Sequence, residues 1–516
     1  MALRRGDLVA GLTVWAVLVP ESLAYASIAG VSPVVGLYAA PPALVLYAIL
    51  GSSRHLIVGP MSATAALSAA AVAPHFGLTP VLAVVTGVVA LGAGLLRLGF
   101  LANFISEPVL KGFIVGLALT IIAGQLPKLF GVEKGEGDFF EQLWHLLGEL
   151  GGTHGATLAI GVVSLAIVLG LRRFAPVVPG SLAAVAFGVL LVELLDPDGV
   201  DIVGSIDSGL PHVGLPDASA SDYLNLAAAA VGVALVGFAE GLGAAKTYAA
   251  RHHYEIDTNR ELIGLGAANL GSGLASGMVV NGSLSKTAVN GGAGAQSQMS
   301  GIVVAVLTVV TLLFLTGLFE SLPEATLAAV VIAAVIELVD VPALVRLYRV
   351  WTSRLGHIYG RASRPDFLAA VAALAGVLVF DTLPGLFIGI GVSLVLLLYR
   401  ASRPNVAVLG RLPDGHWVDV ARAEAEPEPG VVALRVEAGL FFANAEHVRQ
   451  TVLAHAREEG VHSVVLDAVT MPFVDVTAAQ MLAQLRDELE RDGVRLEVVH
   501  EIGQVRDVMA AVSRAR

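Results

Sequence analysis

Apolar residues along the chain gather into about fourteen stretches separated by short polar segments. A helix needs about 20 mostly apolar residues to cross a bilayer, so this pattern predicts a polytopic α-helical membrane protein with fourteen segments. The third and tenth stretches are too short to cross, and they predict half-helices. The stretches lie at 7–29, 36–50, 62–74, 80–96, 104–126, 155–174, 179–195, 224–249, 261–275, 284–294, 299–318, 324–339, 366–381 and 384–400.

The two short stretches open with sequences that are unusual for a membrane helix, Gly59-Pro60-Met61-Ser62-Ala63-Thr64 and Asn281-Gly282-Ser283-Leu284-Ser285-Lys286-Thr287. Irregular backbone at membrane depth persists only where protein or a water-filled cavity satisfies its amides. Paired interruptions at corresponding positions of two halves indicate the binding site of a transporter. The residues that we expect to bind the substrate here are Ser62, Ala63, Thr64, Ser283, Leu284, Ser285 and Lys286.

The composition agrees with a membrane protein. Hydrophobic residues make up 56% of the 516 positions and charged residues 14%, whereas soluble domains have about 25% charged residues. The chain has no cysteine, which excludes disulfides and thiolate metal sites, and we predict no metal, cofactor or nucleic acid as a partner. The apolar stretch after Arg4 and Arg5 runs to about Ala29 without a small-residue cleavage site, so no cleavable signal peptide is expected.

The connecting loops alternate in charge, and this predicts the topology. The loop at 196–222 has six aspartates and no Lys or Arg. Basic residues gather on the other side and place both termini in the cytoplasm, across the inner membrane of a cell. The pattern divides near the acidic loop into seven plus seven segments, and because seven is odd, the second half is inverted relative to the first. The basic residues are Arg4, Arg5, Arg54, Arg97, Lys111, Arg172, Arg173, Arg251, Arg260, Arg346, Arg349, Arg354, Arg361, Arg364, Arg400 and Arg403.

From about Asn405 the character of the sequence changes to that of a soluble α/β domain. Strands are predicted at 431–436, 464–466 and 494–499. Helices are predicted from Asn444 to about 459 and from Asp475 to about 491, each with that first residue as its N-cap. Alternating strands and helices imply a small sheet covered by helices, without a phosphate loop, a metal cluster or a nucleophile triad.

Several motifs resemble those of a known family. The first predicted span closely resembles the signature of the SulP (sulfate permease) anion transporters. The matching residues are Gly11-Leu-Thr-Val-Trp-Ala-Val-Leu-Val-Pro20-Glu21-Ser-Leu-Ala-Tyr25-Ala26, followed by Ala29-Gly30-Val-Ser-Pro33 and Gly36-Leu37-Tyr38. The family often has Gln where this chain has Glu21. Further matches are Lys111-Gly112-Phe113 with Gly116, Asn259-Arg260-Glu261-Leu262 with Gly266 and Asn269, and residues 282–287, where Arg often replaces Lys286.

The tail motifs Val464-Val465-Leu466-Asp467 and Val474-Asp475-Val476-Thr477 resemble a STAS domain, the regulatory module that typically ends these proteins. The resemblance implies a 7+7 inverted-repeat fold similar to that of the uracil permeases. In that fold a core of spans 1–4 and 8–11 moves against a gate of spans 5–7 and 12–14. It also implies a homodimer in membrane lipid. We expect a transporter domain at 1–400, with repeats at about 1–200 and 220–400, and a cytoplasmic STAS domain at 405–516.

In such a fold the two half-helices point their N-termini at each other. A helix N-terminus presents free N–H groups and about half a positive charge, which favours an anion, and Lys286 adds a full cation. Tyr25 and Phe113 are further candidates for lining the pocket, although aromatic residues in apolar spans are more often packing. The alternative is that 59–64 is a surface turn and 281–287 a polar loop.

Two carboxylates fall within predicted spans, where an ionisable residue indicates function. Glu21 follows Pro20 and is interpreted as the proton acceptor for coupled transport, or else as a structural carboxylate tied to Lys286 or to backbone amides. Glu240 is interpreted as a site for a coupling cation, as a residue that positions Lys286, or as a partner of Lys246.

These features favour a secondary active transporter that is not an enzyme. We expect symport of a proton with an inorganic oxyanion such as sulfate, or with a small dicarboxylate, by an elevator-like motion. A bicarbonate or chloride carrier, either sodium-coupled or an exchanger, is the main alternative. An anion channel and a STAS-bearing sensor are others. A nucleobase permease would be expected to have a carboxylate where Lys286 stands.

Overall fold

The computed structural model describes residues 3–100, 106–135, 137–175, 178–206, 208–349, 365–380, 382–412, 416–420, 425 and 428–515. The chain divides into two compact units. The first consists of Met1–Arg349 and Asp366–Val392, and the second of Val350–Pro365 and Ser393–Arg516.

The first unit is helical, and each of the fourteen predicted stretches contains a helix, so the fourteen-segment prediction is confirmed. Among the described residues, seven helices are long and apolar enough to cross a membrane, the last of which, Pro384–Ser402, continues into the second unit. α3 and α12 are short as predicted, with 11 and 9 residues. The helices of the first half are α1 (Arg5–Ile28), α2 (Pro33–Leu50), α3 (Ser62–Val72), α4 (Thr79–Leu95), α5 (Glu107–Phe130), α6 (Phe139–Glu149), α7 (Gly155–Phe174) and α8 (Gly180–Leu195). Those of the second half are α9 (Ala220–Asn225), α10 (Ala227–Arg251), α11 (Thr258–Leu274), α12 (Leu284–Gly292), α13 (Met299–Phe314), α14 (Glu324–Val335), α15 (Val341–Arg349), α17 (Pro365–Phe380) and α18 (Thr382–Ser402).

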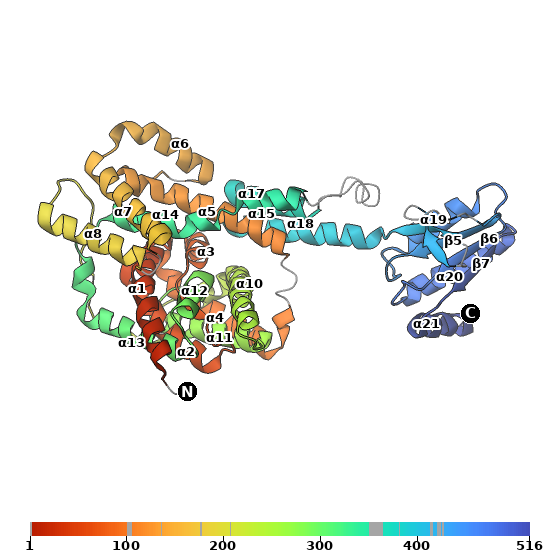
Figure 1. The fold of residues 1–516 in the computed structure, drawn as a ribbon, viewed down its shortest axis with the longest axis horizontal. Coiled ribbons are helices and arrows are strands. Elements are labelled where there is room, and N and C mark those ends of the chain that lie inside the picture. Colours follow the sequence, from red (N-terminus) through yellow and green to blue (C-terminus); the bar gives the residue numbers. More distant parts are fainter. Residues whose placement is uncertain are drawn as a thin grey trace. The chain divides into compact units, whose positions relative to one another are not determined.

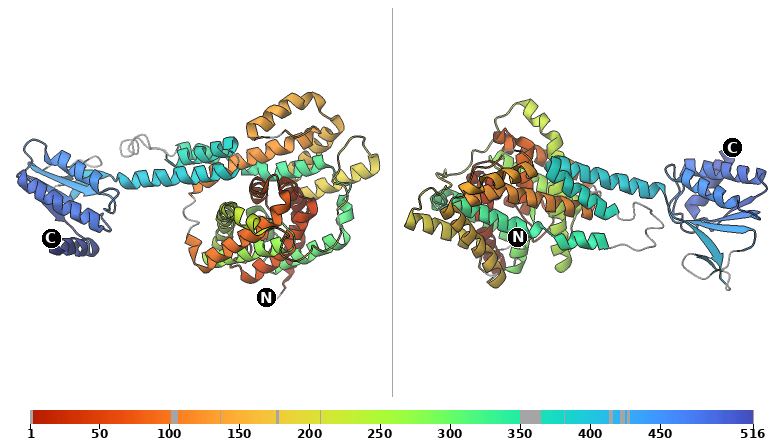
Figure 2. Two further views of the ribbon diagram at one scale, coloured as in Figure 1. Left: turned by 180° about the vertical axis from the view of Figure 1, so that it is seen from behind. Right: turned by 90° about the horizontal axis from the view of Figure 1, so that it is seen from above.

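The helices of the first unit pack in two groups, each with members from both halves of the sequence. One group contains α1, α2 and α4 together with α10, α11 and α13, and the closest pairing is between α4 and α11. The other contains α5, α7 and α8 together with α14. Figure 1 shows α5, α7 and α14 on one side of this unit and α2, α4 and α11 on the other, and the view from behind in Figure 2 separates the same groups. For these ten helices the division follows the core and gate that the family resemblance implies.

The backbone before each half-helix forms a short strand, which the sequence analysis did not anticipate. β1 (Ile57–Gly59) leads into α3, and β2 (Asn281–Ser283) leads directly into α12. The two strands pair antiparallel, with Val58 opposite Gly282. Residues more than 220 positions apart in the sequence therefore satisfy each other's amides inside the unit, as irregular backbone in a membrane requires.

Glycines let the helices of the first group approach closely. A Cβ added at Gly36 on α2 would lie 2.0 Å from the carbonyl oxygen of Ser22 on α1. A Cβ at Gly266 on α11 would lie 2.5 Å from the amide nitrogen of Leu91 on α4. The backbones touch at these crossings, which explains why the motif residues Gly36 and Gly266 carry no side chain.

The second unit contains a five-stranded mixed sheet in the order β4-β3-β5-β6-β7. β5, β6 and β7 are parallel to one another, whereas β3 is antiparallel to both β4 and β5. Side chains from β5, β6 and β7 form one apolar core with the helices, and the opposite face carries a smaller cluster that includes Ala433 and Leu409. The elements are β3 (Val406–Arg411), β4 (Trp417–Asp419), β5 (Val431–Val436), α19 (Ala445–Ala456), β6 (Ser463–Asp467), α20 (Val476–Arg491), β7 (Arg495–Val499) and α21 (Gly503–Ala515).

The three predicted strands and two predicted helices of this unit are present, but one cap is wrong. Asp475 accepts a hydrogen bond from the Ala478 amide and caps α20 as predicted. Asn444 precedes α19 but makes no side-chain cap. Its amide nitrogen instead donates to the carbonyl oxygens of Gly439 and Ala401, and its oxygen accepts from the Phe441 amide. Asn444 therefore ties the preceding loop together, and a sequence pattern cannot distinguish these two uses of the same side chain.

We expect Gly36→Ala to destabilise the first unit by about 1–3 kcal/mol or more, because the added methyl group meets a backbone carbonyl that cannot move away. The thermal midpoint of the purified protein in detergent measures this. Gly92→Ala in α4 is the matched control, because a Cβ there meets nothing within 4 Å. The control should be neutral or slightly stabilising, and equal midpoints for the two variants would contradict the close crossing of α1 and α2.

Candidate functional site

The β1–β2 pair brings the two half-helices together. α3 begins at Ser62, three residues after β1 ends, and α12 begins at Leu284, immediately after β2. Paired strands lie about 5 Å apart, so the two helix starts belong to one small region. The structure thus joins the two interruptions that the sequence analysis singled out.

Lys286 is the centre of this region, and its side chain is almost fully buried, with 1% exposed. Its ammonium lies 2.7 Å from a carboxylate oxygen of Glu21 on α1. It also donates to the carbonyl oxygen of Pro60, 3.2 Å away between β1 and α3. The ring of Tyr25 completes the surroundings, with its centroid 4.9 Å from the ammonium nitrogen. The cation is therefore neutralised by a buried carboxylate and held by two separate segments, α1 and the turn between β1 and α3.

The start of α12 carries two serine hydroxyls, on Ser283 and Ser285. The Ser283 hydroxyl accepts from the Lys286 amide and caps the helix. It also lies 3.1 Å from the Ser285 hydroxyl. Ser283 is buried, whereas Ser285 and Leu284 are exposed. An approaching group would therefore meet Leu284 and Ser285 first.

The start of α3 is more enclosed. Ser62, Ala63 and Thr64 are all buried, and the Thr64 hydroxyl donates to the carbonyl oxygen of Met61. Alanine and small hydroxyl side chains leave the backbone of this turn close to its neighbours. Two helix N-termini and one ammonium are thus collected near Pro60, an arrangement that suits an anion once the charge of Glu21 is removed.

Glu240 lies on α10 and is half-buried. Its carboxylate accepts a hydrogen bond of 3.1 Å from the side-chain amide of Asn281, the first residue of β2. Among the residues that the structure describes, Glu240 forms no ion pair with Lys286 or with Lys246. Glu240 therefore contacts the binding framework through Asn281 rather than through either lysine.

The two aromatic candidates differ. Tyr25 faces Lys286 and interacts electrostatically with Glu21, one turn earlier on α1. Phe113 is fully buried on α5, a helix that contacts α3. Of these two aromatic residues, both within the described part of the chain, Tyr25 contacts the ion pair directly, whereas the structure gives Phe113 no such contact.

Several polar side chains that hold the framework escaped the sequence analysis. The Thr287 hydroxyl accepts from the Ile57 amide at the start of β1. The side-chain amide of Asn269 on α11 donates to and accepts from the backbone of Val280, just before β2. Asn269 belongs to one of the motifs that resemble the SulP family, but its hydrogen bonds to Val280 become evident only in the folded structure.

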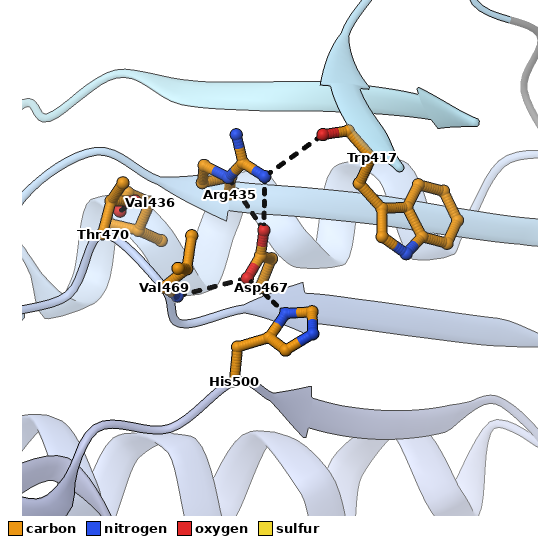
Figure 3. Close-up of polar contacts among 7 residues, drawn as sticks. All are labelled: Trp417, Arg435, Val436, Asp467, Val469, Thr470 and His500. Carbon is orange, nitrogen blue, oxygen red and sulfur yellow. Dashed lines mark hydrogen bonds and ion pairs between the residues drawn. The ribbon is translucent and has the colours of Figure 1, made fainter. Parts of the chain in front are cut away.

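The second unit has its own polar cluster at the carboxyl ends of β5 and β6, drawn in Figure 3. One oxygen of Asp467 accepts from the Arg435 guanidinium at 2.8 and 2.6 Å. The other accepts from the Val469 amide and lies 3.0 Å from His500 Nδ1. Burial by itself raises the pKa of the Asp467 carboxyl, but the hydrogen bonds from Arg435, His500 and the Val469 amide outweigh it and hold the pKa below its usual range. Both oxygens of Asp467 are occupied by these donors. Asp467 therefore links the end of β6 to Arg435 on β5 and to His500 after β7.

Comparison with known proteins agrees with the sequence motifs. Residues 5–358 match the sulfate permease family, and residues 422–514 match the STAS domain. A probable sulfate transporter of Mycobacterium tuberculosis is 36% identical over 524 residues, which cover 99% of this chain and 91% of the relative. The structure of the mouse anion transporter Slc26a9 in an inward-facing state has a TM-score of 0.87 at 23% identity. The superposition covers 99% of this chain and 88% of the Slc26a9 chain. The transmembrane domain of the cyanobacterial bicarbonate transporter BicA has a TM-score of 0.64 at 22% identity, covering 77% of this chain and 98% of its own.

We predict strong coupling between Lys286 and Glu21 in a double-mutant cycle. Lys286→Met alone leaves a buried carboxylate without its partner and should destabilise the protein by about 3–5 kcal/mol. Lys286→Met combined with Glu21→Gln removes both charges and should recover much of that loss. Thermal midpoints of the four proteins in detergent measure the coupling.

The pair of Lys111 and Glu107 is the matched control for this cycle, because its atoms also lie 2.7 Å apart but its side chains are 34% and 77% exposed. Exposed helix pairs contribute only about 0.3–0.5 kcal/mol. Equal coupling energies for the buried and the exposed pair would contradict the burial of the Lys286 charge.

The low pKa of Asp467 predicts acid sensitivity of the second unit. Its ionised carboxylate stabilises the fold above the ordinary carboxyl pKa of about 4, and this contribution is lost as the pH falls through the lowered pKa. Hydrogen exchange in β6, corrected for intrinsic rates, should increase between about pH 6 and pH 3. Asp467→Asn should lack this extra pH dependence, whereas Asp492→Asn, at an exposed site, should retain it.

Proposed function

This chain belongs to the sulfate permease family of anion transporters, and we propose that it is a secondary active carrier that moves a small oxyanion such as sulfate, or a small dicarboxylate, together with protons. The substrate class is supported by the names of the relatives and by the buried cation between two helix N-termini. The ion pair of Lys286 and Glu21 is the observation that carries the proposal.

The ion pair supplies a physical reason for coupling. While Glu21 is ionised, the pair is neutral and offers an anion little attraction. A proton on Glu21 leaves the Lys286 ammonium as an uncompensated cation at the meeting point of α3 and α12. Proton binding should therefore raise anion affinity, and by linkage anion binding raises proton affinity by the same factor. On this proposal Ser62, Ala63, Thr64, Ser283, Leu284, Ser285, Lys286, Tyr25 and Phe113 bind the substrate or line its site.

An elevator-like motion is supported by the grouping of the helices. Within the described part of the chain, the residues in direct contact with the Lys286 ammonium lie on α1 and in the turn between β1 and α3. α1 belongs to the first group of helices, and we assign the half-helices α3 and α12 to the same group. That group can move as one body against α5, α7, α8 and α14 without breaking the ion pair. Access then alternates because the intact site moves past the second group of helices.

Residues 1–400 form the transporter domain on this proposal, with inverted repeats at about 1–200 and 220–400, and residues 405–516 form the STAS domain. Both termini lie in the cytoplasm of a cell whose inner membrane holds the protein, in keeping with the positive-inside bias. The chain acts as a homodimer in the lipid bilayer.

Sodium-coupled bicarbonate transport is the second candidate. It is supported by the likeness to the transmembrane domain of a bicarbonate transporter and by Glu240. Within the described part of the chain, the Glu240 carboxylate lies beside β2 and makes a hydrogen bond only to a neutral amide. A carboxylate and an amide oxygen are ligands that a small hard cation prefers.

Uptake into proteoliposomes distinguishes the candidates. Purified protein is tested with labelled sulfate, succinate, bicarbonate and chloride, under an imposed proton gradient and separately under a sodium gradient. Accumulation of sulfate or succinate that needs the proton gradient supports the proposal. Accumulation of bicarbonate that needs sodium supports the second candidate, and currents far above carrier rates without uphill uptake would indicate a channel.

We expect Glu21→Gln to retain anion binding and to lose proton-driven accumulation, because Gln resembles the neutral acid but cannot release a proton. Anion-for-anion exchange should persist. Both are measured in the same proteoliposomes, with Glu240→Gln as the control, which should keep proton-driven uptake, although with fewer protons for each divalent anion. If the Glu21→Gln variant still concentrates its anion under a proton gradient, Glu21 is not the coupling group.

A further inference from the structure

We propose that a cavity near the N-terminus, separate from the Lys286 site, binds a phosphate-type oxyanion, and that its source is the headgroup of an anionic phospholipid. The cavity has a volume of about 430 Å³. Three guanidinium groups line it, from Arg4, Arg54 and Arg260, together with the polar side chains of Gln296 and Gln298. Nothing in the proposed transport cycle uses these arginines.

The three arginines come from different segments and carry charge that neighbouring acids do not neutralise directly. Arg4 precedes α1, Arg54 lies between α2 and β1, and Arg260 lies in the first turn of α11. In the part of the chain that the structure describes, none of the three forms an ion pair. Arg4 donates to the Gln296 side chain, Arg260 donates to the Leu50 carbonyl, and Arg54 stacks on the ring of Tyr254. A guanidinium has five N–H donors, so each arginine retains donors for a ligand.

Two buried carboxylates lie behind the cavity wall, and both are occupied. Asp7 accepts from the backbone amides of Gln296 and Ser297 and from the Ser297 hydroxyl. Glu261 accepts from the Tyr47 hydroxyl and from Ser52 and Ser53. These acids shape the wall by fixing its amides and hydroxyls. A third acid, Asp257, accepts from the backbone amides of Asn259 and Arg260. Since none of these three acids forms an ion pair with Arg4, Arg54 or Arg260 in the described part of the chain, the guanidinium groups suit an oxyanion held by arginine forks.

The apolar rim favours a lipid over a free ion. Ile49 lines the cavity and is 62% exposed. The neighbouring turns of α1 and α2 also expose Leu8, Leu12 and Val45. The cavity is lined from the N-terminal end of α1 and the C-terminal end of α2. The positive-inside bias predicts that both ends lie at the cytoplasmic boundary of the membrane, where lipid headgroups lie. A free oxyanion gains nothing from exposed Ile and Leu side chains, whereas acyl chains leaving the cavity would cover them.

A ligand bound in the cavity should affect the transport site, because residues of the cavity wall hydrogen-bond to the segment before β1. The Gln298 side-chain amide donates to the carbonyl oxygens of Ser53 and Leu56, each at 2.9 Å. Leu56 is the residue before β1, and β1 pairs with the strand that leads to Lys286. A ligand that holds Arg54 and Gln298 together would therefore stabilise the segment on which β1 depends.

The test measures binding of dioctanoyl phosphatidylglycerol, dioctanoyl phosphatidylcholine and inorganic phosphate to the full chain in detergent by native mass spectrometry. We expect phosphatidylglycerol to bind at least about tenfold more tightly than phosphatidylcholine, since a charged hydrogen bond contributes about 1.5–3 kcal/mol and 1.4 kcal/mol corresponds to tenfold. Arg54→Gln and Arg260→Gln should each remove most of this preference. Arg5→Gln, which changes the same charge at an exposed neighbour of Arg4 outside the cavity, should leave it unchanged.

The other possible results of this binding experiment each support or overturn the proposed lipid site. Equal affinities for the two lipids, or equal effects of Arg54→Gln and Arg5→Gln, overturn the site. Inorganic phosphate that binds as tightly as phosphatidylglycerol and displaces it overturns the lipid source and supports a soluble oxyanion. If the arginine variants do not fold, the unsubstituted protein still tests the site, because rising salt should weaken binding of phosphatidylglycerol and leave phosphatidylcholine unaffected.

Discussion

A buried ammonium group is the constraint on which this structure depends. Lys286 has 1% of its side chain exposed, and an isolated charge at that depth would cost many kcal/mol. Glu21 and the ring of Tyr25, both on α1, and the Pro60 carbonyl, between β1 and α3, offset that cost. The charge therefore fixes the relative positions of α1, the start of α3 and the start of α12, and these are the elements that form the candidate site.

The second constraint is backbone hydrogen bonding away from water. Half-helices leave several residues before their first turn without helical partners, and in a membrane those groups need protein partners. β1 and β2 supply them to each other. The side chains of Thr287, Asn269 and Gln298 bind further backbone groups of the segments that precede the half-helices. A polar framework of this kind is rigid because each member has one set of partners. It can thus carry a binding site through a large motion without losing its geometry.

The sequence predicted the parts of this fold that follow from periodicity and composition. The fourteen apolar segments, the two short helices and the alternating elements of the tail all depend on local patterns that single residues do not upset. The β1–β2 pairing could not be predicted, since Ile57-Val58-Gly59 and Asn281-Gly282-Ser283 are only three residues each and lie far apart. The Glu21–Lys286 contact was one of two open interpretations, because only the fold decides which intramembrane charges meet. The predicted cap at Asn444 was wrong for a similar reason, because its amide donates to Gly439 in the preceding loop and to Ala401 in α18 rather than to its own helix.

Charge balance limits what the proposed carrier can move. With Glu21 ionised, the empty site is neutral and can cross the low-dielectric interior without an uncompensated charge. With Glu21 protonated, the site is cationic, and a bound monoanion makes it neutral again. A dianion such as sulfate leaves this pair and its ligand with one negative charge. Glu240, held through Asn281 at the start of β2, could take a second proton, which removes the negative charge of Glu240 itself. Loading sulfate with two protons then leaves the summed charge of Lys286, Glu21, Glu240 and the ligand unchanged. On this proposal one carboxylate suffices for a monovalent substrate, and a divalent one uses both.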